Sequence, residues 1–334
     1  MSAWPEIRLD ACRIVYNDGN HNAFTDLCRF RDHYYLTFRS CPDGHMVFPT
    51  SRILILRSRD GGEWQPVHAF SVAGRDVRDP HFLIFRESLW VYSGTWRYHP
   101  ERPDYRDVNE HLGYAVWSDD GMHWQGPRLL EGTYGYYVWR AAAWGGRAYL
   151  CARRRRGFAP SEGAEEPGAA MQSALLGSDD GLIWHFVGWF QEMYGDETAF
   201  LFELDGAILA IARGPRTRPV ATLCRSRPPY QEWRRTLLER WGQRYLVGGR
   251  KTVDPAAPRT TLYWLADDRL IEALELPSGG DNSYPGFVAL GETRGLLSYY
   301  SSHEGSGSSL APSAIYLAEL SLGGDERARD CEAR

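Results

Sequence analysis

Apolar residues in this chain occur in short runs separated by Gly, Pro, Asp and Ser, and few segments show the three-to-four spacing of an amphipathic helix. Three pairs of runs flank a tight turn and therefore predict β-hairpins. These pairs are 51–57 with 64–70, 113–117 with 124–130, and 171–177 with 184–190. The 13 Trp, 19 Tyr and 13 Phe residues also favour sheets. We expect an all-β chain.

The turns of the three predicted hairpins share the pattern Ser-x-Asp-Gly-x-x-Trp, at residues 58–64, 118–124 and 178–184. The Asp carboxylate can accept hydrogen bonds from backbone N–H groups, the Gly permits a left-handed conformation, and the Trp covers the turn. The copies are 60 residues apart, and equal spacing indicates a repeated structural unit rather than a single chemical site. Each turn offers too few oxygens for the roughly 6 to 8 ligands of Ca²⁺, so we expect no metal.

The repeat has the size of a β-propeller blade, because two further strand candidates lie between consecutive turns, for example at 80–85 and 88–94. We predict a six-bladed propeller of four-stranded antiparallel blades in a single domain, 1–334. The blades span 21–70, 76–130, 137–190, 196–238, 241–276 and 281–320. The last unit shows three strands, so the N-terminal strand 7–16 is expected to close it, since a ring cannot keep an open edge.

The fifth blade is the weakest in the pattern. Its strands are expected at 245–249, 260–265 and 270–276, with a short first strand near Trp241. The fourth strand of the preceding blade is expected at 233–238. A five-bladed ring is the alternative, if this unit is absorbed into its neighbours.

Composition narrows the function classes only modestly. A net charge of −5 gives no reason to expect nucleic acid as a partner. The six cysteines lie far apart without zinc-ligand spacing and are expected to be reduced thiols, and no cofactor is indicated. No run reaches 18 apolar residues, and residues 1–6 lack the features of a signal peptide, so we expect no membrane association and a cytoplasmic location.

The repeated turns resemble the Asp boxes of sialidases, and motifs elsewhere look like those of a bacterial sialidase-like (BNR/Asp-box) β-propeller family. These motifs lie at 21–26, 76–80, 139–140, 196–198, 228–233, 276–284, 298–305 and 315–318. The resemblance covers nearly the full chain. It implies an exo-acting glycoside hydrolase that removes a terminal, anionic sugar from a glycan, with the carbohydrate as its partner.

The resemblance also implies roles for particular residues. Sialidases use a Tyr nucleophile on the last blade, a Glu on the fourth blade that assists it, an Asp acid/base near the first two blades, and three Arg residues that clamp a carboxylate. Tyr284 and Glu197 match the first two positions. Where a sialidase begins its first blade with Arg-Ile-Pro, this chain reads Asn-Ala-Phe-Thr at 22–25, so one clamp Arg is missing from its expected position.

Ionisable residues concentrate where a propeller brings its inner strands together, just before each inner strand and in the loops that follow the second strands. A phenol with a pKa of about 10 needs a base to become a nucleophile, and Glu197 is the candidate. As acid/base we rank Asp79, which precedes Pro80, ahead of Asp26 and then His45. Candidate substrate-binding residues are His21, Arg39, His45, Arg78, Arg140, Arg213, Arg250, Asp281 and His303.

Three alternatives remain open from the residues. A furanosidase would use Asp26, Asp79 and Glu197 as three carboxylates, and a uronate lyase would use His21 or His45 with a Tyr for proton transfer. A non-catalytic propeller would only bind a glycan, since this fold serves many functions. Arg78 and Asp79 could also form a purely structural salt bridge.

Overall fold

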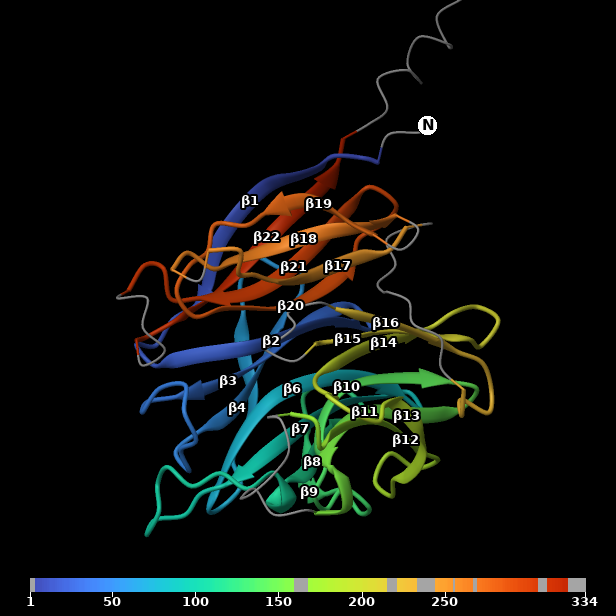
Figure 1. Cartoon of the computed structure of the whole chain (residues 1–334). Coiled ribbons are helices and arrows are strands. Elements are labelled where there is room, and N and C mark those ends of the chain that lie inside the picture. Colours follow the sequence, from blue (N-terminus) through green and yellow to red (C-terminus); the bar gives the residue numbers. More distant parts are fainter. Residues whose placement is uncertain are drawn as a thin grey trace, which may run out of the picture.

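The computed structural model describes residues 4–158, 168–214, 221–232, 244–254, 256–266, 269–305 and 311–323. They form six antiparallel sheets (Figure 1). The six-bladed propeller predicted from the repeat is confirmed, and the five-bladed alternative is wrong. No helix in the described ranges is both long and apolar enough to span a membrane.

Three sheets follow the sequence directly, each with four consecutive strands. The first contains β2 (His21–Phe30), β3 (His33–Cys41), β4 (Arg52–Ser58) and β5 (Gln65–Phe70). The second contains β6 (Arg75–Phe85), β7 (Ser88–Arg97), β8 (Leu112–Ser118) and β9 (Gln125–Leu129). The third contains β10 (Tyr137–Trp144), β11 (Arg147–Arg155), β12 (Met171–Ser178) and β13 (His185–Gln191). Short 3-10 helices lie at Val108–Glu110 and Arg156–Phe158.

The fourth and fifth sheets show three strands each among the described residues. They contain β14 (Thr198–Phe202), β15 (Ile208–Ala212) and β16 (Thr222–Ser226), then β17 (Leu246–Lys251), β18 (Arg259–Ala266) and β19 (Arg269–Glu275). The strands expected at 233–238 and near Trp241 lie outside the described residues. First strands of neighbouring sheets, such as β2 with β6, contact one another and therefore line the centre of the ring.

The sixth sheet joins the two ends of the described chain. It contains β20 (Asn282–Ala289), β21 (Arg294–Ser301) and β22 (Ala314–Leu322), and β1 (Ile7–Tyr16) pairs antiparallel with β22 as the outer strand (Figure 1). Ile7 is 3% exposed and packs in one apolar cluster with Leu246 and Leu262 of the fifth sheet. The predicted closure by the N-terminal strand is thus confirmed, and it also seals two neighbouring blades.

The repeated turns connect the third and fourth strands of the first three sheets. In the third sheet, the Ser178 hydroxyl accepts a bond from the Gly181 N–H at 2.9 Å, and Asp180 Oδ1 accepts bonds from the N–H groups of residues 182 and 183 at 2.8 Å. Gly181 has φ of 85°, as the left-handed turn requires. Its carbonyl accepts a bond from Tyr92 of the preceding sheet at 3.1 Å. The turn therefore also fastens one blade to the next, which explains why it recurs with the blade.

Candidate active site

Four of the inner strands carry a β-bulge, where two residues face a single residue of the second strand. The bulged pairs are Phe24-Thr25 in β2, Asp79-Pro80 in β6, Trp139-Arg140 in β10 and Tyr284-Pro285 in β20. Phe24, Asp79 and Tyr284 have positive φ values of 63°, 51° and 51°, which are costly for side chains other than glycine. A bulge bends a strand and redirects its side chains. The same local distortion is therefore repeated around the centre of the ring.

Contacts between the bulges converge on Tyr284. Its ring lies edge-on to Phe24 with centroids 5.0 Å apart, and edge-on to Trp139 at 6.4 Å. Thr25 donates a hydrogen bond to the Tyr284 carbonyl at 2.8 Å, and the Ser298 hydroxyl donates to Thr25 at 3.0 Å. These bonds hold the strained backbone of Tyr284 in place.

Tyr284 and Glu197 form a hydrogen-bonded pair. The phenol donates to Glu197 Oε1 at 2.9 Å, although the two residues are 87 positions apart. Arg213 Nη1 lies 3.0 Å from the other oxygen, Oε2, and the Arg213 backbone N–H donates to the Glu197 carbonyl at 2.9 Å. The carboxylate is thus fixed on one side by a cation and faces the phenol on the other.

The phenol is protonated at neutral pH. Burial, together with the nearby charges of Glu197 and Asp79, raises the pKa of Tyr284 well above its ordinary value. Such a group becomes a nucleophile only when a partner takes its proton during the reaction. Glu197 accepts the hydrogen bond of this phenol and is therefore within reach of its proton.

Asp79 is a carboxyl group whose environment favours the neutral form. Burial and the charge of Glu197 raise the pKa of Asp79 to about 7, against the opposing effect of Arg78 and of a hydrogen bond donated by the Tyr137 hydroxyl to Oδ2. Its Oδ1 is buried and accepts no hydrogen bond within the described ranges. Asp79 can therefore carry a proton near neutral pH, as a general acid must.

Asp26, the second acid/base candidate, lies in an environment that favours the charged form. Its carboxylate accepts hydrogen bonds from the Phe82 N–H at 2.8 Å and from the Leu27 N–H at 3.0 Å, with Arg140 at 3.4 Å and His81 at 3.5 Å. Although burial opposes it, these partners lower the pKa of Asp26. Asp26 remains charged and joins β2 to β6, which makes it a poorer proton donor than Asp79.

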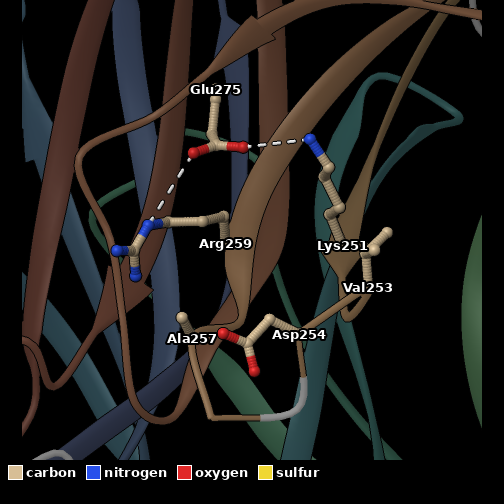
Figure 2. A pocket seen from close by; sticks show the side chains of 6 residues that line it. All are labelled: Lys251, Val253, Asp254, Ala257, Arg259 and Glu275. Carbon is tan, nitrogen blue, oxygen red and sulfur yellow. Dashed lines mark hydrogen bonds and ion pairs between the residues drawn. The ribbon is translucent and has the colours of Figure 1, made fainter.

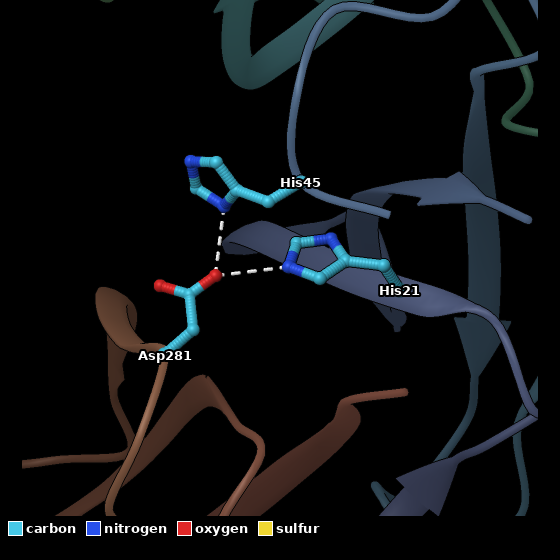
Figure 3. Close-up of side chains that lie close together, drawn as sticks. All are labelled: His21, His45 and Asp281. Carbon is cyan, nitrogen blue, oxygen red and sulfur yellow. Dashed lines mark hydrogen bonds and ion pairs between the residues drawn. The ribbon is translucent and has the colours of Figure 1, made fainter. Parts of the chain in front are cut away.

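His21, His45 and Asp281 form a second cluster (Figure 3). His21 Nε2 and His45 Nδ1 lie 2.9 Å and 2.7 Å from the same oxygen, Asp281 Oδ2. The other oxygen, Oδ1, accepts hydrogen bonds from Tyr300 at 2.8 Å and Arg250 at 3.1 Å. Although burial opposes it, the hydrogen bonds with the two histidines and the charge of Arg250 hold the pKa of Asp281 far below its usual range, whereas burial lowers the pKa of His21.

Arg39 and Arg78 do not take the positions expected of substrate-binding residues. Arg39 is 0% exposed, and its guanidinium contacts both oxygens of Asp76 at 2.9 Å and 3.1 Å and the carbonyls of Gly44 and Met46 at 3.0 Å. Arg78 pairs with Asp76 at 2.6 Å. The hypothesis of a salt bridge between Arg78 and Asp79 is therefore wrong, because the Arg78 guanidinium pairs with Asp76. The two arginines support the loop that presents His45 instead.

The remaining candidate substrate-binding residues differ in their exposure and in their contacts. Arg213 and Arg250, with side chains 49% and 35% exposed, are the more accessible cations near Tyr284. Arg140 is 23% exposed and contacts Asp26. His303 lies on the loop after β21, where its Nδ1 is 2.7 Å from the Ser301 hydroxyl and its ring packs on Tyr316.

Several residues of the cluster were not singled out from the sequence. Tyr137 donates to Asp79, Tyr300 donates to Asp281, and Trp139 packs against Tyr284. Trp139 and Tyr300 fall inside the motifs at 139–140 and 298–305, which offered a usable signal. Tyr137 offered no such signal, because an aromatic residue on an inner strand is normally expected to be part of the hydrophobic core.

A separate surface hollow lies beside the fifth sheet (Figure 2). It is lined by Lys251, Val253, Asp254, Ala257, Arg259 and Glu275. Lys251 pairs with Glu275 at 3.2 Å, and Arg259 lies 3.8 Å from the same carboxylate. Both cations of the hollow are thus paired with Glu275, and neither belongs to the Tyr284 cluster.

Comparison with known proteins supports the fold. No protein-family model matches this sequence, and no curated protein matches it either. A crystal structure of a protein of unknown function from Dyadobacter fermentans is similar, with a TM-score of 0.69 and 22% identity over 96% of this chain and 100% of that one.

Sialidases and neuraminidases are also structural neighbours. Trypanosoma rangeli sialidase in complex with sialic acid has a TM-score of 0.63 and 11% identity over 97% of this chain, which spans 59% of the Trypanosoma chain. The hemagglutinin-neuraminidase ectodomain of parainfluenza virus 5 has a TM-score of 0.61 and 10% identity over 95% of this chain and 87% of that one. At such identities the likeness shows a sialidase-like propeller and no more.

Proposed function

We propose that this protein is an exo-acting glycoside hydrolase that removes a terminal, anionic sugar, with Tyr284 as nucleophile, Glu197 as its base and Asp79 as acid/base. The observation that carries the proposal is the 2.9 Å hydrogen bond from the Tyr284 phenol to Glu197. The pair lies beside a carboxyl group, Asp79, whose pKa is raised to about 7. Nucleophile, base and acid are thus held together by three different blades.

The reaction would proceed in two steps. In the first, the Tyr284 oxygen attacks the anomeric carbon and its proton passes to Glu197, while Asp79 protonates the leaving oxygen. In the second, Asp79 removes a proton from water, which displaces the tyrosine, and Glu197 returns its proton to the phenol. The proton transfer from Tyr284 to Glu197 leaves the net charge of the pair unchanged, and bond formation then neutralises the tyrosine oxygen, which suits an anionic substrate.

An anionic sugar is supported by the accessible cations beside Tyr284. Arg213 and Arg250 are 49% and 35% exposed, and each can offer further N–H donors to a carboxylate. Each is partly neutralised by its own acidic partner, Glu197 or Asp281. Since the first blade lacks the expected clamp Arg, we include uronides as well as sialosides among the substrates.

The test is fluorophore release from a panel of sialosides, uronides and furanosides by wild type and by Tyr284→Phe. We expect one acidic glycoside to be cleaved, and kcat to fall about 10³-fold or more in the variant, because removing a nucleophile leaves only binding and electrostatic stabilisation. Tyr134→Phe is the matched control, since Tyr134 is 63% exposed and, among the described residues, stacks on Phe158 away from Tyr284.

Full activity in Tyr284→Phe would contradict the proposal. A product that absorbs in the ultraviolet through a new double bond would instead indicate a lyase. Tight binding of an oligosaccharide that is recovered intact would indicate a binding protein.

A further inference from the structure

Two imidazoles and one carboxylate meet at a single point beside the Tyr284 cluster (Figure 3). They come from the start of β2, from the loop between β3 and β4, and from the residue before β20, at separations of 260 and 236 residues from Asp281. We propose that His21, His45 and Asp281 bind a divalent transition-metal ion of the zinc class.

The donor atoms have the spacing such an ion needs. One ring nitrogen of His21, one of His45 and an oxygen of Asp281 all lie within 4.8 Å of one another. Ligand atoms placed tetrahedrally at about 2.1 Å from zinc are separated by about 3.4 Å. The two nitrogens lie 2.9 Å and 2.7 Å from Asp281 Oδ2, so each N–O separation would have to widen by about 0.5 to 0.7 Å to admit the ion.

The Asp281 carboxylate is held in position through Oδ1, the oxygen that the histidines do not contact. Tyr300 and Arg250 donate to Oδ1, and the Asp281 backbone N–H donates to the Ser302 hydroxyl at 2.8 Å. Hydrogen bonds of this kind orient metal ligands. They leave Oδ2 directed at the two histidines. The charge of Arg250 opposes a second cation, so we expect weaker binding than at a closed four-ligand zinc site.

The ligand set defines the class of ion. Two imidazole nitrogens and one carboxylate oxygen suit zinc and similar transition metals, whereas Ca²⁺ and Mg²⁺ prefer oxygen ligands alone. Three protein ligands leave a fourth position open. The side chains of His21 and Asp281 are 0% and 7% exposed and that of His45 is 27% exposed, so the open position lies on the His45 side.

The proposed metal site is adjacent to Tyr284, and Tyr284 is not one of its three ligands. The Phe24 ring contacts both sides, with centroids 5.4 Å from His45 and 5.0 Å from Tyr284. The metal proposal therefore stands or falls independently of the proposed hydrolase activity.

The experiment titrates Zn²⁺ into the full-length, tag-free, chelator-treated protein by calorimetry, under reducing conditions. We expect one equivalent to bind. His45→Ala should weaken binding by at least about 10- to 100-fold, the loss typical even for disturbing the partners of metal ligands. His123→Ala should bind as wild type does, because His123 is 92% exposed and lies in a surface turn with Asp120.

Co²⁺ absorption provides the second measurement, since the described cysteines are free and could bind metal themselves. Visible d–d bands without a thiolate charge-transfer band, lost in His45→Ala, would support the site. Absence of binding to folded wild type, unchanged affinity in folded His45→Ala, or a thiolate spectrum would overturn it. His45 is chosen because it is more exposed than His21 or Asp281, so its replacement is least damaging to folding.

Discussion

Asp79 and Asp26 are both buried carboxyl groups on inner strands, at 4% and 6% exposure, yet their protonation differs. Both have cations nearby, but Asp26 has two backbone N–H donors, whereas Asp79 has one phenol donor and lies close to the charge of Glu197. Burial penalises the charged form in both, and the charge of Glu197 beside Asp79 and the hydrogen bonds to Asp26 decide the outcome. Of these two residues, Asp79 is the one that can carry a proton near neutral pH.

Asp79 should therefore make the protein less stable as the pH rises. Its pKa is about 7 in the folded state and near the ordinary 3.8 when unfolded, so the folded state binds more protons between these values. Stability contributed by the protonated group is present at low pH and is lost as the pH rises through about 7. We expect the free energy of unfolding, measured with urea at pH 5 and pH 8, to fall by on the order of a few kcal/mol more in wild type than in Asp79→Asn.

An exposed carboxylate serves as the control for this measurement. Asp179 is 72% exposed, and Asp179→Asn should keep the pH dependence of wild type. Equal pH dependence in wild type and Asp79→Asn would show that Asp79 is not protonated in the folded state. If the proposed mechanism holds, kcat/KM should also decline above about pH 7.

At the scale of elements, the bulges of the inner strands position the cluster, and they depend on close approach between neighbouring strands. A Cβ at Gly286, directly after the bulge of β20, would lie 2.4 Å from the Leu27 backbone nitrogen and 2.8 Å from the Asp26 Cα. Backbone atoms cannot give way as a flexible side chain can. The glycine therefore allows β20 to lie against β2 and brings Tyr284 to the centre.

Gly286→Ala should accordingly destabilise the protein by about 1–3 kcal/mol, the usual cost of overpacking. Gly249→Ala, in β17, is the matched control because a Cβ there meets nothing within 4 Å. Chemical denaturation of both variants measures the difference. Equal stability of the two would mean that the contact between β20 and β2 is looser than described.

At the scale of the whole molecule, the ring is closed by the pairing of β1 with β22, which joins segments from opposite ends of the chain. Ile7 is 3% exposed in an apolar cluster shared by the fifth and sixth sheets, and the Trp264 indole donates to the Pro5 carbonyl at 2.8 Å. The N-terminal strand therefore both covers an edge and fills the seam between two blades.

Ile7→Ala should cost about 2–5 kcal/mol in thermal or urea unfolding, since it leaves a cavity at this seam. Ile14, on the same strand, is 39% exposed, so Ile14→Ala should change stability by only roughly 0.5 kcal/mol. Comparable losses in both variants would indicate that β1 contributes through its backbone pairing and not through the packing of Ile7.

The sequence by itself determined the repeat, the strand pattern and the closing strand, and the resemblance to sialidases pointed to Tyr284 and Glu197. The repeat and the strands follow from local chemistry, because a turn needs its Asp and Gly wherever it occurs and a half-buried strand needs its apolar face. The partners of each charge were decided only by the tertiary structure. Arg39 pairs with Asp76, Asp281 gathers two histidines, and the bulges bring Phe24 to Tyr284. Such pairings depend on distances between segments up to 260 residues apart, and electrostatic energies depend on distance and burial, which sequence spacing does not contain.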